Sequence, residues 1–285
     1  MGFKVGLDDG HGIKTAGKRT VALKEDLKFN GKVRKKGSII HENEFNEAIM
    51  HKVEPHLKRC GISYMETAPT DDDTSLNTRA NRANNADCDV LVSIHANALE
   101  GTKWQTGAYG LVVIKTKNCQ SKTDKLADIM YKHLKTVDFP SNGETKYGVR
   151  VDTEISGFTL AILRQTKMPA VLVELGFMDN WNDVKVMCTE KFQNECAEQI
   201  ARAICEYAGI KFVPEKETPK YTTGLYAVIV DSLNIRKGPS TDYPIVGKIT
   251  DRGTYTIVEV DGNWGKLKSG AGWICITEKW CEKRR

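Results

Sequence analysis

Three short apolar runs in this sequence each lead to a side chain that can bind a metal or transfer a proton. The runs are FKVGL (3–7), DVLVSI (89–94) and AVLVEL (170–175), and they lead to His11, His95 and Glu174. Short, nearly continuous apolar runs rich in β-branched residues are typical of central strands that helices cover on both faces. In an open α/β sheet, ligands bind beyond the carboxyl ends of the strands, so these three side chains are expected at one edge of the sheet.

The stretch HENEFNEAIMHKVEPHLKRCG (41–61) predicts a helix that adds a fourth side chain to this edge. Its apolar face repeats at helical spacing through Phe45, Ile49, Val53 and Leu57. Extending that face back by one turn reaches Glu42 at the helix N-terminus, on the side that faces the sheet and therefore near His11 and His95. HENEF begins like the H-E-x-x-H zinc helix, but Phe45 replaces the second histidine, so His41 is expected to be an exposed neighbour.

Two histidines and one carboxylate form the ligand set of a catalytic zinc site, which keeps one position open for water. The metal lowers the pKa of that water and polarises the carbonyl that the water attacks. Such a site also needs a carboxylate that is not a ligand, to take the proton from the water and pass it to the leaving amine. Glu174 is predicted to fill this role, because burial at a strand end would raise its pKa. The alternatives are a core histidine at His95 and a structural carboxylate at Glu174 that pairs with an arginine.

The composition changes near GIKFVPEKETPKYTTG (209–224), where prolines, charges and a threonine pair indicate a linker. Before this stretch, strand-like runs alternate with amphipathic segments, and after it short β-rich runs are separated by turns. We therefore expect a catalytic domain over 1–212, a linker over 213–223 and a second domain over 224–285. The expected fold class is α/β, with a twisted, mostly parallel sheet between helices on both faces, plus a small all-β barrel.

Charge and apolar content exclude two classes of partner. The net charge of +5 is too small to suggest nucleic-acid binding, although it would not oppose an anionic polymer. No apolar run approaches the length of a membrane span. The N-terminal MGFKVGLDDGHG lacks the basic and apolar regions of a signal peptide, so we expect a chain made in the cytoplasm without a membrane anchor. The eight cysteines show no C-x-x-C spacing and are expected to be mostly buried thiols.

Four motifs, in order, resemble those of the zinc-dependent N-acetylmuramoyl-L-alanine amidases of the Amidase_3 type. They are DDGHG (8–12), ENEFN (42–46), LNTRANRAN leading to SIHANA (76–98) and RQTKMPAVLVELGFMDN (164–180), within a resemblance that spans 4–208. By position, the resemblance implies that His11, Glu42 and His95 hold Zn²⁺ and that Glu174 is the general base and acid. The implied reaction hydrolyses the amide between the lactyl group of N-acetylmuramic acid and the L-alanine of the peptidoglycan stem peptide.

Two residues of these motifs and one stretch outside them have no assigned role. Arg79 and Asn97 lie in matching motifs, but the resemblance gives them no firm role. A basic stretch, KEDLKFNGKVRKKGS (24–38), precedes Glu42 and departs from the common family pattern. This departure leaves the details of the substrate groove undetermined and does not affect the predicted metal ligands.

The last part of the chain resembles a bacterial SH3 domain of the SH3b type, through LNIRKGPSTDYPIVGKI (233–249) and GNWGKLKSGAGWICI (262–276). That family is associated with binding cell-wall polymers, so the resemblance implies a module that targets the wall. From Gly224 onward the net charge is +3, which suits an anionic wall polymer. Trp264, Trp273 and Trp280 are candidates for a surface that stacks on sugar or peptide, the alternative for Trp273 being a place in the core.

The leading interpretation is a two-domain peptidoglycan hydrolase, a phage endolysin that reaches the cell wall after release. One alternative is a mother-cell autolysin of sporulation with the same activity. A zinc carboxypeptidase acting on wall peptides has the same metal shell but an H-x-x-E pair, whereas Glu42 is far from His11 in the sequence. The remaining alternatives are a wall-binding protein with a degenerate amidase domain and an adaptor that binds proline-rich peptides.

Overall fold

The structure is a computed structural model that describes residues 2–106, 110–117, 120–139, 148–215 and 220–284. The chain divides into two compact units, Met1–Glu215 and Lys216–Arg285. Residues 216–219 of the predicted linker, and Cys119 among the predicted buried thiols, lie outside the described residues.

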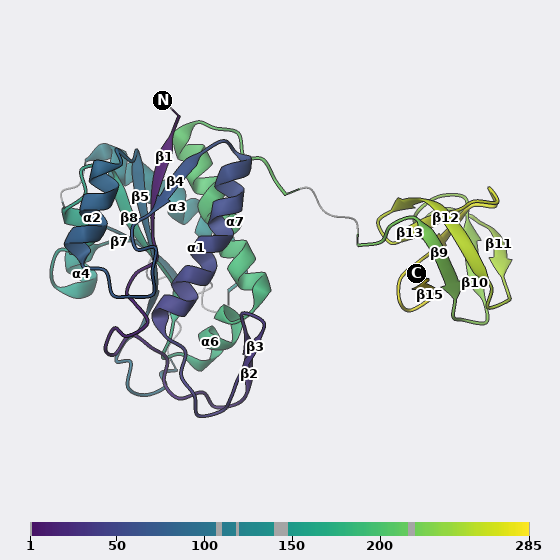
Figure 1. Ribbon diagram of the computed structural model, residues 1–285, viewed down its shortest axis with the longest axis horizontal. Helices are drawn as coiled ribbons and strands as arrows, with labels where there is room; N and C mark the ends of the chain where they lie inside the picture. The colour runs from purple at the N-terminus through teal and green to yellow at the C-terminus, as the bar shows by residue number, and fades with distance from the viewer. Residues whose placement is uncertain (1, 107–109, 118–119, 140–147, 216–219, 285) are drawn as a thin grey trace. The chain divides into compact units, whose positions relative to one another are not determined.

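The first unit is built on a sheet with the strand order β4-β1-β5-β8-β6-β7 (Figure 1). Its strands are β1 (Lys4–Asp8), β4 (Ser63–Glu66), β5 (Val90–Asn97), β6 (Leu111–Lys115), β7 (Val149–Val151) and β8 (Ala170–Phe177). Strands β4, β1, β5 and β8 run parallel to one another, whereas β6 is antiparallel to β8. The three strands predicted from the apolar runs are β1, β5 and β8, which are neighbours, so the expectation of a mostly parallel sheet is confirmed.

Helices cover both faces of this sheet, as predicted. On one face lie α1 (Glu42–Arg59), α3 (Ser121–Leu134) and α7 (Glu190–Ala208), and on the other lie α2 (Leu76–Asn85) and α5 (Ala161–Arg164). The shorter α4 (Asp152–Ser156) and α6 (Trp181–Met187) follow β7 and β8. Alternate residues of β5 enter the two cores, Val92 on the α1 side and Leu91 on the α2 side, and both are fully buried. Burying side chains of this kind contributes roughly 1.5–3 kcal/mol each.

Helix α1 begins at Glu42, where the apolar pattern places its start. The Glu44 carboxylate accepts the backbone N–H of His41 at 2.9 Å, which closes the first turn. The predicted apolar face is buried along its length, at Phe45, Ile49, Val53 and Leu57. The helix therefore fixes the position of Glu42 at the edge of the sheet.

The basic insert at 24–38 forms a hairpin of β2 (Leu27–Phe29) and β3 (Lys32–Arg34). Phe29 is fully buried, with its ring centroid 4.9 Å from that of Phe45 in α1. Arg34 forms an ion pair with Glu44 in the first turn of the same helix. The insert is thus anchored beside the N-terminus of α1.

The second unit is an antiparallel sheet with the strand order β11-β10-β14-β13-β12-β9-β15. Its strands are β9 (Gly224–Val228), β10 (Leu233–Arg236), β11 (Ile245–Ile249), β12 (Thr254–Asp261), β13 (Trp264–Leu267), β14 (Trp273–Cys275) and β15 (Cys281–Lys283). Tyr226, Ile257 and Ile274 are at the centre of its apolar core. Trp273 is buried at 9% exposure, so the core alternative is the correct one for this residue, whereas Trp264 and Trp280 are half-buried.

Cysteines in the described part of the chain are free thiols, as expected. Cys275 is half-buried, and the others are buried: Cys60, Cys88, Cys188, Cys196, Cys205 and Cys281. No helix among the described residues has the length and apolar character to cross a bilayer.

Candidate functional site

The loop after β1 presents His11 at the carboxyl edge of the sheet. His11 has a φ of 65°, a left-handed conformation that is uncommon for a residue with a side chain. Two buried side chains hold this loop: Arg79 donates from Nη2 to the His11 carbonyl at 2.7 Å, and Asn46 donates from Nδ2 to the Gly10 carbonyl at 3.0 Å. The unusual backbone conformation is therefore stabilised from both α1 and α2.

Glu42 and the two predicted histidines meet at this edge. Glu42 Oε1 lies 2.9 Å from His95 Nδ1 and 3.5 Å from His11 Nε2. The two imidazole rings are nearly perpendicular, with their centroids 4.9 Å apart. Each of the three residues offers a ligand atom, and these atoms all lie within 4.8 Å of one another. The structure thus brings together three side chains that are widely separated in the sequence.

The protonation of these groups follows from burial and from their mutual charges. Burial lowers the pKa of His11 to about 4, so its imidazole is neutral near pH 7. Burial opposes ionisation of Glu42, but the hydrogen bond and charge of His95, with His11 and Lys18, outweigh it and lower its pKa to about 2. For His95, burial is outweighed by the hydrogen bond and charge of Glu42, and the pKa is raised.

The donor set fits a cation. His95 Nδ1 and Glu42 Oε1 face each other, and two lone pairs at this distance need a proton or a positive ion between them. The other oxygen of Glu42, Oε2, is buried without a hydrogen-bond partner, and the Lys18 ammonium lies 3.5 Å from it. Two imidazoles and one carboxylate with an open side match a three-ligand catalytic metal site.

Glu174 lies next to this group on β8, as the register partner of His95 on β5. Its Oε2 is buried and has no hydrogen-bond partner among the described residues. Burial raises its pKa to about 7, with His95 lowering it and Glu42 raising it. No lysine or arginine of the described part of the chain forms an ion pair with it, so the alternative of an arginine-paired structural carboxylate does not hold.

Several residues of the site have no counterpart in the sequence predictions. Arg79, which had no assigned role, is 1% exposed and lies 3.0 Å from Asp8. Burial raises the pKa of Asp8, but Arg79 and the hydroxyls of Ser93 and Thr67 outweigh this and hold it below its ordinary value. Asp8, Arg79 and Ser93 lie in the quoted motifs and Thr67 lies in none of them. Nothing in the sequence pairs a buried carboxylate with donors from three separate segments.

Asn97 and His41 take positions at the margin of the site. Asn97, also without an assigned role, accepts the backbone N–H of Ala98 on its Oδ1 at 2.7 Å. His41 is half-buried and its backbone pairs with Arg19, so the expectation that it is exposed is wrong. The segment around Arg19 thus lies beside the backbone of His41 at the start of α1.

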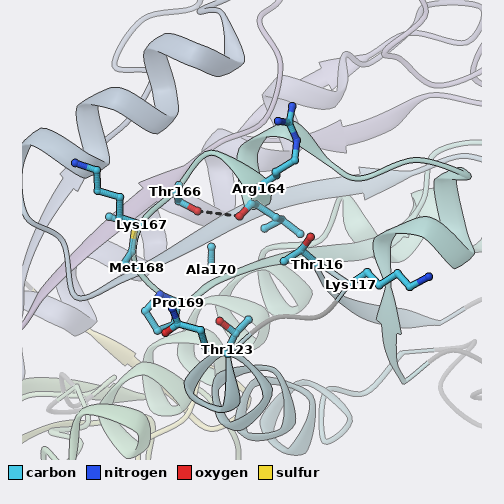
Figure 2. Close-up of a pocket in the computed structure, with 11 residues that line it drawn as sticks. Thr116, Lys117, Thr123, Arg164, Thr166, Lys167, Met168, Pro169 and Ala170 are labelled. Atoms are coloured by element: carbon cyan, nitrogen blue, oxygen red, sulfur yellow. Dashed lines mark hydrogen bonds between the residues drawn. The ribbon is translucent and has the colours of Figure 1, made fainter.

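Two other features of the first unit differ from this site. His51, Glu54 and Glu66 form a second group of possible metal ligands, but His51 is exposed on the surface of α1. A cavity of about 240 Å³ lies at the other end of β8, near Ala170 (Figure 2). Figure 2 shows Lys117, Arg164 and Lys167 with their charged ends directed away from one another, so this cavity gathers no reactive groups.

Comparison with known proteins gives two family matches. A model described as N-acetylmuramoyl-L-alanine amidase matches residues 5–206, and one described as Bacterial SH3 domain matches residues 231–275. An endolysin of Bacillus phage SPP1 is 31% identical over 224 residues, which cover 77% of this chain and 71% of the endolysin. The sporulation-specific N-acetylmuramoyl-L-alanine amidase of Bacillus subtilis is 28% identical over 176 residues, which cover 62% of this chain and 60% of that protein.

A solved structure shows the same similarity. The catalytic domain of CwlV, an N-acetylmuramoyl-L-alanine amidase from Bacillus (Paenibacillus) polymyxa var. colistinus, is 30% identical with a TM-score of 0.55. The alignment covers 73% of this chain and 99% of that domain.

Gly10→Ala is expected to weaken metal binding and leave the fold intact. A Cβ on Gly10 would overlap the His95 imidazole, so the ring would have to leave its position. We expect zinc affinity to fall by at least about tenfold, as for other changes that reorient a metal ligand. Equilibrium dialysis with zinc measures this, and circular dichroism checks the fold.

Two variants serve as controls for the Gly10→Ala measurement. Gly2→Ala meets no atom within 4 Å and should bind zinc as the unmodified chain does. His51→Gln removes a possible ligand of the surface group and shows how much zinc is held outside the candidate site. Unchanged zinc affinity in Gly10→Ala would show that the His95 ring position does not matter for binding.

Proposed function

This chain belongs to the N-acetylmuramoyl-L-alanine amidase family, and on that basis we propose that His11, Glu42 and His95 hold a zinc ion while Glu174 is the general base and acid. The enzyme is a peptidoglycan hydrolase that cleaves the amide between N-acetylmuramic acid and the L-alanine of the stem peptide. The observation that most supports these roles is the position of Glu174, with a buried, unpartnered oxygen beside the three converging ligand atoms.

The residues of the site divide the reaction between them. A zinc ion bound there supplies a Lewis acid that lowers the pKa of water and polarises the scissile carbonyl. Glu174, with its pKa raised to about 7 by burial, takes a proton from the attacking water and later gives it to the leaving amine. Glu42, at the N-terminus of α1 and ionised at neutral pH, contributes the negative charge of the ligand set.

The second unit is proposed to bind the cell wall. Its match to the bacterial SH3 domain supports this role. Trp264, Trp280, Asn234 and Arg236 line a cavity of about 210 Å³ in this unit, which offers aromatic faces beside polar groups. We further propose that anionic wall polymers contribute to binding, because this part of the chain is net basic.

The biological setting that we propose is that of a phage endolysin, which acts on the wall after release from the cell in which it is made. The similarity to the endolysin of Bacillus phage SPP1 supports this setting. A sporulation autolysin with the same activity is the second candidate, and the similarity to the sporulation-specific amidase of Bacillus subtilis favours it. The two candidates share the active site and the bond that is cleaved.

Digestion of purified peptidoglycan tests the reaction and its metal together. We expect new N-terminal alanine, no new reducing sugar, loss of activity with a chelator and recovery with zinc. Recovery with added manganese or cobalt in place of zinc would identify a different metal, because the ligand types alone permit several. New amines from another residue would indicate a peptidase such as the carboxypeptidase alternative.

Glu174→Gln is expected to retain zinc and to lose hydrolysis by about 10²–10⁴-fold, because it keeps the shape of the side chain and removes the proton carrier. Alanine release from peptidoglycan and zinc content measure the two properties in one preparation. Glu190→Gln, a change at an exposed carboxylate on α7, should leave both unchanged. Substantial residual activity in Glu174→Gln would remove this residue from the proposed role.

Deleting the chain from Gly224 onward is expected to weaken binding to intact walls, on the order of 10²-fold where both units engage one wall. Cleavage of a soluble muropeptide should change little, since the candidate site lies within the first unit. Sedimentation with walls and alanine release from the muropeptide measure the two effects. Equal losses in both assays would mean that the second unit helps to form the active site.

A further inference from the structure

A row of buried hydrogen bonds connects His95 to Ser93 and Ser93 to Asp8. His95 Nδ1 faces Glu42, and His95 Nε2, on the opposite side of the ring, lies 3.1 Å from Ser93 Oγ. Ser93 Oγ lies 2.5 Å from Asp8 Oδ2. Ser93 and Asp8 are 0% and 1% exposed, so water does not compete for these bonds.

Strand geometry explains why the three side chains meet. Ser93 and His95 are two residues apart on β5 and therefore project from the same face of the sheet. Asp8 ends β1 as the register partner of Ser93. The three side chains therefore lie one behind another, with the ligand atom of His95 at the open end.

The Asp8 carboxylate determines which atom is the donor in each hydrogen bond of this row. Asp8 Oδ1 accepts from Arg79 Nη1 at 3.0 Å and from the hydroxyl of Thr67, an environment that favours an ionised carboxylate. An ionised carboxylate only accepts, so the single hydrogen of the Ser93 hydroxyl is directed to Asp8 Oδ2. Ser93 Oγ then has only lone pairs to offer to His95, and Nε2 must be the donor.

We propose that Ser93 and Asp8 are positioning residues for metal binding, which keep the hydrogen of neutral His95 on Nε2 and leave the Nδ1 lone pair facing the metal position. The inference rests on the proposed function, because it takes His95 as a metal ligand. Groups that fix the tautomer of a ligating histidine in this way raise metal affinity, and their loss typically costs 10–100-fold in affinity or activity.

Two buried variants separate this role from a general structural one. Ser93→Ala and Thr67→Val each remove one hydroxyl that donates to Asp8, but only the Ser93 hydroxyl also contacts His95. In the full-length chain, we expect zinc affinity to fall about 10–100-fold in Ser93→Ala and to stay unchanged in Thr67→Val. Competition with a chelator of known affinity measures it, and circular dichroism confirms that both variants are folded.

A second measurement does not depend on a variant that folds. In the unmodified, zinc-loaded chain with isotope-labelled histidine, NMR should show the His95 hydrogen on Nε2 and the metal on Nδ1. A hydrogen on Nδ1 would overturn the proposal, as would equal zinc affinity in Ser93→Ala and the unmodified chain, or equal losses in both variants. Failure of the unmodified chain to bind zinc would instead contradict the proposed function itself, so the two failures are distinguishable.

Discussion

The buried ion pair between Asp8 and Arg79 is the interaction on which the arrangement of the site depends. Both side chains are 1% exposed, and their charged atoms lie 3.0 Å apart. Removing one partner of such a pair costs about 3–5 kcal/mol, because the other charge is then buried without compensation. The pair also connects the segments around it, since Arg79 supports the left-handed backbone at His11 and Asp8 accepts the hydroxyls of Thr67 and Ser93. This salt bridge and the hydrogen bonds of its two partners therefore link β1, α2, β5 and the loop after β4 at the edge where the proposed ligands meet.

Two carboxylates at this edge differ in their ionisation because their surroundings differ. Glu42 is surrounded by His95, His11 and Lys18, which lower its pKa to about 2 despite its burial, whereas burial raises the pKa of Glu174 to about 7. A site that separates the pKa values of two carboxyl groups in this way assigns one of them to charge and the other to proton transfer. The parallel register of β5 and β8 places Glu174 beside His95, so the proposed ligand and the proposed proton carrier are held at adjacent positions of one sheet.

The residues that the sequence predicted are those that a periodic pattern or a motif marks. The apolar runs predicted β1, β5 and β8. The apolar face of the helix that ends near Leu57 predicted the position of Glu42, because burial imposes a regular spacing on apolar residues. The hydroxyls of Ser93 and Thr67 could not be predicted as partners of Asp8, since a buried hydroxyl leaves no periodic signal and its partner is distant in the sequence. The antiparallel direction of β6 and the hairpin within the basic insert depend on tertiary pairing. The partial burial of His41 likewise follows from contact with the preceding segment, which the local pattern does not encode.

Burial limits the reactivity of several cysteine side chains of this protein. Burial raises the pKa of Cys188, Cys205 and Cys281 to about 12, so these side chains remain thiols and not thiolates near neutral pH. Oxidation and disulfide exchange proceed through the thiolate, and access to a buried sulfur is limited as well. The described cysteines are free thiols, so they offer no disulfide for reduction to break. Burial therefore makes these three thiols slow to react with an oxidant for as long as the structure around them stays folded.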